Sequence, residues 1–180
     1  MISEIKLNSA PAVERDAVDM LLACHQRIRN FTGIAARLAE AAGAAPEAVA
    51  NAAEAVHRYY SIALPLHEAD ENESVYPRLR GRLSDPAERA SLQAMVDQHG
   101  PIDEVVARLL PRWNDLKSRP ANLATCAADL RSDSSHLQDL WTEHLALEEE
   151  IVFPLIRARL TAEDLDEIHR EMKQRRGVSA

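Results

Sequence analysis

A pattern of histidine, glutamate and proline occurs twice in this sequence and constrains its fold more than any other feature. The first copy runs from His67 to Pro77 and the second from His144 to Pro154. In each copy a glutamate follows the histidine by four residues, and an aromatic residue precedes the closing proline. Four residues make about one helical turn, so both side chains share one helix face. Each copy therefore predicts a helix that presents an imidazole beside a carboxylate.

Apolar residues recur at helical spacing over most of the chain and predict an all-α protein. Alanine, leucine, glutamate and arginine favour helices, glycine is scarce at 5 residues, and runs of β-branched residues are missing. We expect long helices over about 13–42, 46–79, from 86 onward and from 120 to about 160, and a short helix from 161 to about 177. Short connections favour antiparallel neighbours, so we predict an up-down-up-down four-helix bundle with a short extra C-terminal helix. We expect a single domain over residues 1–180, with the core of the bundle at about 13–160.

Prolines and capping residues mark local features of these helices. Asp85 precedes a first-turn proline and is expected to cap the third helix, with Glu88 placed for a capping box. Pro65 is expected to kink the second helix, and the pair at 100–101 is expected to bend the third.

Charge and composition exclude several classes of partner. The formal charge is -8, and basic residues alternate with acidic ones, so we expect no nucleic-acid partner. No apolar run reaches the roughly 18 residues of a membrane span, and no signal peptide is evident. The two cysteines, Cys24 and Cys126, form no CxxC pair, and we expect free thiols in a cytoplasmic protein. The oligomeric state is not predicted.

The repeat extends beyond the two motifs. His25 precedes the first motif and His99 precedes the second, each within an apolar helical pattern. Each half of the chain therefore offers one inward histidine and one histidine–glutamate pair. Together the candidate metal ligands are His25, His67, Glu71, His99, His144 and Glu148.

These residue types in this number favour a metal site. A lone histidine on an apolar face is usually a core residue with its hydrogen bonds satisfied, and a single pair at this spacing usually stabilises a helix surface. The repetition favours metal binding instead, because a buried carboxylate needs a partner charge. Imidazole with carboxylate suits iron, manganese or zinc, and six ligands exceed the needs of one tetrahedral zinc. Two metals bridged by both glutamates and a solvent oxygen, with about one open position each, fit the count.

At these residues the chain resembles the hemerythrin-like, or HHE cation-binding, family. The resemblance covers roughly residues 16–160 and rests on the order H…HxxxE…H…HxxxE, met by the six residues given above. It implies a four-helix bundle with two non-haem iron ions joined by an oxo or hydroxo bridge, although manganese or a mixed pair stays open. Family members bind dioxygen, sense oxygen or iron, or process nitric oxide and peroxide.

The sequence departs from the oxygen-carrying members at one place. Those have two histidines four residues apart on the third helix, whereas Met95 and Asp103 flank His99 here. One ligand is then missing, which favours a more reactive or more labile site over reversible oxygen carriage. Asp103 is a candidate replacement, and Glu68 resembles an added ligand in an iron-sensing domain of a ubiquitin ligase subunit. The ordinary alternative for Asp103 is a solvent-facing or supporting role.

Three functions are compatible with this pattern. The leading one is binding of dioxygen, nitric oxide or peroxide at a dinuclear iron centre. The others are turnover of peroxide or nitric oxide, and sensing of iron or redox state through a protein partner. The remaining histidines are expected at the surface or, for His57 and His136, as supports of the ligands, with His169 exposed.

Overall fold

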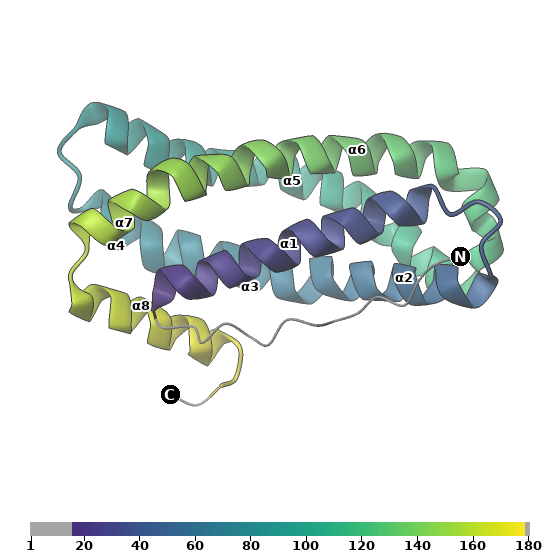
Figure 1. Ribbon diagram of the computed structural model, residues 1–180, viewed down its shortest axis with the longest axis horizontal. Helices are drawn as coiled ribbons and strands as arrows, with labels where there is room; N and C mark the ends of the chain where they lie inside the picture. The colour runs from purple at the N-terminus through teal and green to yellow at the C-terminus, as the bar shows by residue number, and fades with distance from the viewer. Residues whose placement is uncertain (1–15, 179–180) are drawn as a thin grey trace.

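The computed structural model describes residues 16–178, and these form helices throughout (Figure 1). The α-helices are α1 (Ala17–Ala39), α2 (Pro46–Arg58), α3 (Leu64–Ala69), α4 (Tyr76–Arg80), α5 (Pro86–Ser118), α6 (Leu123–Leu147), α7 (Phe153–Arg159) and α8 (Ala162–Arg175). Three π-helical turns, η1 (Tyr59–Ala63), η2 (Asp70–Val75) and η4 (Glu148–Val152), and one 3₁₀ turn, η3 (Pro120–Asn122), complete them. No strand occurs in the described part, so the all-α prediction is confirmed.

The π turns join shorter helices into long rods. Helical structure is continuous from α2 to α4 and from α6 to α7. Helix α1 packs against α2 and α6, and α5 packs against the same two helices. Figure 1 shows these rods lying along the long axis of the molecule, with α8 at one end. This packing is compatible with the expected helical bundle. Within residues 16–178 no helix is both long enough and apolar enough to cross a membrane.

Helix ends agree with most of the capping signals. The Asp85 carboxylate accepts a 2.7 Å hydrogen bond from the Ala87 N–H and caps α5. Glu88 does not close the expected capping box, because its carboxylate accepts a 2.6 Å bond from Arg159 instead. The first helix ends at Ala39, three residues before its expected end, and its expected start at 13 lies outside the described residues.

A π turn precedes each of three prolines, Pro65, Pro77 and Pro154. The expected kink at Pro65 therefore takes the form of a π turn within a continuous rod. Proline lacks an N–H and crowds the preceding turn, and a wider π turn relieves both problems. By contrast, α5 continues as an α-helix through the Gly100–Pro101 pair, where a bend was expected.

The apolar core consists of two clusters with a polar layer between them. One contains Ile28, Leu64, Ile102 and Trp141, and the other contains Leu21, Val75, Met95 and Val152. Each rod passes from one cluster to the other through buried histidine or glutamate. On α1, for example, His25 lies between Leu21 and Ile28, and all three are fully buried. The two apolar clusters thus seal the layer from both sides.

Helix α8 covers one side of the second cluster and of η2. Ile168 and Met172 are fully buried there. The buried Asp70 carboxylate of η2 meets the guanidinium groups of Arg175 and Arg176 at 3.0 and 2.7 Å. Apolar anchors and ion pairs together hold α8 against the rod that carries the first motif.

We predict that Ile168→Ala lowers the free energy of unfolding by about 2–5 kcal/mol, because it opens a cavity under α8. Asp166→Ala, an exposed change on the same helix, should stay within about 0.5 kcal/mol of the parent. Urea denaturation followed by circular dichroism measures both. Equal losses in the two variants would show that α8 is not anchored through Ile168.

Candidate metal centre

Six polar side chains from four rods meet in the layer between the clusters. All are buried, with at most 5% of each residue exposed: His25 on α1, His67 on α3, Glu71 on η2, His99 on α5, His144 on α6 and Glu148 on η4. They form two groups, His25, His67, Glu71 and Glu148, and Glu71, His99, His144 and Glu148. Within each group the donor atoms lie within 4.8 Å of one another. The structure thus brings together all six residues proposed from the sequence; ligation itself stays a prediction.

Glu71 faces one histidine of each group with a different oxygen. Its Oε1 lies 3.1 Å from His67 Nε2, and its Oε2 lies 3.1 Å from His99 Nε2. A carboxylate placed in this way can give one oxygen to each of two neighbouring ions. The two rods that carry His67 and His99 are thereby linked through a single side chain.

Glu148 takes the corresponding place in the second half of the chain. Its Oε2 lies 3.0 Å from His25 Nε2 and 3.5 Å from His144 Nε2. Both motif glutamates are therefore common to both groups, while the histidines divide two and two. The ring centroids of His25 and His67 are 5.4 Å apart, and those of His99 and His144 are 4.9 Å apart.

Two of the histidines are held from outside by hydrogen-bond acceptors. His25 Nδ1 lies 2.7 Å from Glu149 Oε1, and His144 Nδ1 lies 3.1 Å from Gln98 Oε1. An oxygen acceptor at Nδ1 fixes the hydrogen there and leaves a lone pair on Nε2, which faces the centre. At 3.0 Å from Glu148 Oε2, the lone pair of His25 needs a proton or a cation between the two atoms.

Burial and mutual contact set the charges of the two glutamates. Burial, and then the nearby Glu148 carboxylate, raise the pKa of Glu71 well above its usual value. Burial alone would raise the pKa of Glu148 too, but the contact with His25 and the surrounding imidazoles lower it to about 2. The surroundings therefore shift the pKa values of the two carboxyl groups in opposite directions.

Burial also disfavours the charged form of three of the imidazoles. It lowers the pKa of His144 to about 4, lowers that of His67 well below its usual value, and lowers that of His99. Neutral imidazoles with free lone pairs are the form that binds metal. Several inward atoms have no hydrogen-bond partner in the described residues, including Nε2 of His25, His67 and His144 and both oxygens of Glu148. Buried donors and acceptors without partners are costly, which points to a cation as the missing partner.

The two further candidate ligands pair with each other. Burial, and then the Asp103 carboxylate, raise the pKa of Glu68 to about 8. Neither residue belongs to the two donor groups. Met95, one of the two residues four positions from His99, is fully buried in the second apolar cluster and adds no nitrogen or oxygen donor beside His99.

The remaining histidines lie outside the centre. His136 is exposed, as expected. His57 is partly buried, and so is His169, which corrects the expectation that it is exposed. None of the three belongs to the donor groups.

Sequence reasoning missed the outer supports, Gln98 and Glu149. Glu149 meets a histidine that lies 124 residues earlier in the chain, and no local pattern marks such a contact.

The comparison with known proteins agrees with this arrangement. The model of the hemerythrin HHE cation binding domain matches residues 16–156, a range that contains all six side chains. The chain belongs to the hemerythrin HHE family. The sequence resemblance is thus confirmed, and the buried histidine and glutamate groups fit the cation binding in the family's description.

A relative of this hemerythrin-family chain occurs in Haemophilus influenzae. It is an uncharacterized protein that is 29% identical over 175 residues, which cover 93% of this chain and 94% of that protein. The similarity therefore covers more of the chain than the region that the family model matches.

Acid should destabilise this hemerythrin-family domain when it is free of metal. His144 has a folded-state pKa of about 4 against an ordinary 6.5, so between these values the unfolded chain binds the additional proton. The free energy of unfolding is then complete above pH 6.5 and falls as the pH drops toward 4, by up to about 1.4 kcal/mol per pH unit. Urea titrations at several pH values across this range give the free energy of unfolding at each pH. This free energy should fall less steeply with falling pH in His144→Asn than in the parent.

The exposed His136→Asn is the matched control and should keep the slope of the parent. Identical slopes for all three proteins would contradict a neutral, desolvated His144.

Proposed function

We propose that the protein holds two iron ions between these six side chains and binds dioxygen, nitric oxide or peroxide there. One observation carries the proposal, namely that two buried groups of four donors share both glutamates. Sharing of this kind supports a dinuclear centre, because a carboxylate can give one oxygen to each ion. In this proposal the rods follow the up-down-up-down order expected from the sequence.

The donor set fits iron. Imidazole and carboxylate together suit iron, manganese and zinc, whereas calcium and magnesium prefer oxygen alone. His25 and His67 would hold one ion, His99 and His144 would hold the other, and Glu71 and Glu148 would bridge them. The inward atoms without partners would then be satisfied, and the negative charge of the pair would be balanced.

When bound, iron would supply redox chemistry and coordination positions for a small ligand. Each group offers two histidines and two shared carboxylates, fewer than the six donors of an octahedral ion. The chain itself would exclude bulk water through the two apolar clusters and fix the four imidazoles toward one point. Metal binding would require Glu71 in its ionised form, against the raised pKa that burial gives it.

Two other functions use the same centre. Turnover of peroxide or nitric oxide is favoured by the buried Met95, which leaves the His99 group without a further donor. Sensing of iron is favoured by α8, which docks on η2 directly beside Glu71. We place the protein in the cytoplasm, in keeping with its free thiols at Cys24 and Cys126.

The first test is metal content. Protein loaded with ferrous iron under anaerobic conditions and freed of excess metal should carry two irons per chain by elemental analysis. Glu71→Ala should carry one or fewer, because it removes a donor from both groups. The control His136→Ala should keep two. One zinc, or no metal, in the parent would overturn the proposal, and two manganese ions would correct the metal.

The second test separates binding from the alternatives. The reduced, iron-loaded protein should change its visible spectrum with one equivalent of dioxygen or nitric oxide and recover it when the gas is removed. Steady consumption of peroxide that is lost in His144→Ala would instead establish an enzyme. A large gain in protease sensitivity of α8 on removal of iron would instead establish a sensor.

A further inference from the structure

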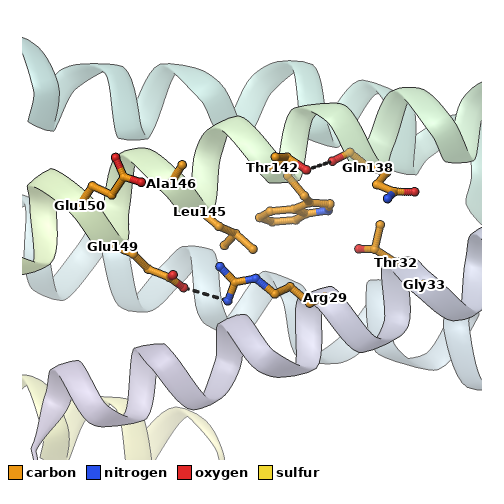
Figure 2. A pocket seen from close by; sticks show the side chains of 10 residues that line it. Arg29, Thr32, Gly33, Gln138, Thr142, Leu145, Ala146, Glu149 and Glu150 are labelled. Atoms are coloured by element: carbon orange, nitrogen blue, oxygen red, sulfur yellow. Dashed lines mark hydrogen bonds and ion pairs between the residues drawn. The ribbon is translucent and has the colours of Figure 1, made fainter.

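A pocket lies between α1 and α6, and residues of η4 complete its lining (Figure 2). It has a volume of about 400 Å³, and its lining includes Arg29, Trp141 and Glu149. The Trp141 ring lies 5.4 Å from the ring of His144, and the Glu149 carboxylate lies 2.7 Å from His25 Nδ1. Trp141 therefore lies between the pocket and His144, and Glu149 lies between the pocket and His25.

Glu149 connects this pocket with a buried imidazole. Its Oε1 accepts from His25 Nδ1 at 2.7 Å and from Arg29 Nη1 at 2.9 Å, as Figure 2 shows for the Arg29 contact. Its side chain is 29% exposed, whereas the side chain of His25 is fully buried. The partly exposed Glu149 carboxylate thus fixes the orientation of the buried His25 ring.

We propose that Glu149 is the positioning residue of His25, held in place by Arg29 across the α1–α6 pocket. This inference rests on the proposed metal centre. The Glu149 carboxylate keeps the hydrogen of His25 on Nδ1 and so directs the Nε2 lone pair toward the ion. It also limits rotation of the ring, and a carboxylate at this place strengthens the imidazole as a ligand.

Arg29 completes the arrangement. Its guanidinium lies 2.9 Å from the same Glu149 oxygen that faces His25 and balances the charge of the carboxylate, so Glu149 is held in place beside the ring.

The two groups of donors are therefore supported unequally. Glu149 supports His25 with a charged carboxylate, whereas Gln98 supports His144 with a neutral amide oxygen. Charge-assisted hydrogen bonds are the stronger kind. We infer that the group containing His25 depends more on its outer support than the group containing His144.

The test compares Glu149→Ala and Glu149→Gln with a matched control, Glu150→Ala. Glu150 is the next residue, lines the same pocket and is exposed, so it reports the effect of removing a nearby negative charge. Cobalt(II) is titrated into each apoprotein against a competing chelator. Glu149→Ala should weaken cobalt binding about 10–100-fold. Glu149→Gln retains an oxygen acceptor and should recover part of the loss, and Glu150→Ala should match the parent.

A second measurement needs no metal. Long-range ¹H–¹⁵N correlation spectra of the apoprotein distinguish the two imidazole tautomers, with His25 assigned by loss of its signals in His25→Gln. The parent should carry the hydrogen on Nδ1, and Glu149→Ala should shift His25 toward the other tautomer or a mixture. The Glu150→Ala spectrum should be unchanged.

These readouts separate the inference from the proposed function. An unchanged His25 tautomer in Glu149→Ala, or an equal loss of cobalt affinity in Glu150→Ala, overturns the positioning role. A parent protein that takes up no cobalt and no iron overturns the dinuclear centre, and the spectra alone then decide whether Glu149 orients His25.

Discussion

Two buried carboxylates in contact, Glu71 and Glu148, are the constraint around which the rest of this structure is arranged. Such a pair is unfavourable in a protein interior unless protons, hydrogen bonds or cations compensate it. Here four imidazoles surround the pair, burial and the nearby carboxylate raise the pKa of Glu71, and apolar clusters close the layer above and below. We attribute this polar layer to the cations that we propose it holds.

The backbone supports this layer through its π turns. Glu71 and Glu148 each lie in a π turn, and each of their carbonyl oxygens accepts the N–H of the residue five positions later, Tyr76 and Phe153. A proline follows in both cases. π turns are uncommon and occur often at functional sites, because the additional residue redirects the side chains that follow. In the second half this places Glu148 in the centre while the next residue, Glu149, reaches the outer side of His25.

Helix α8 is the part of the fold that could respond to the centre. It packs on η2, and its arginines pair with the buried Asp70 next to Glu71. A change in the η2 backbone would therefore move both the candidate ligand Glu71 and the Asp70 carboxylate, whose ion pairs hold α8.

The sequence alone determined the all-α class, the extents of most helices and the six residues of the centre, because helical spacing and the repeated motif are local properties of the chain. The tertiary structure decided what depends on residues distant in sequence. It placed Glu149 and Gln98 behind His25 and His144, paired Glu68 with Asp103, and left Met95 in the core. It also placed a π turn before Pro65, where a kink was expected. These outcomes follow from how neighbouring rods pack and which side chains they bring into contact, and no local pattern specifies that.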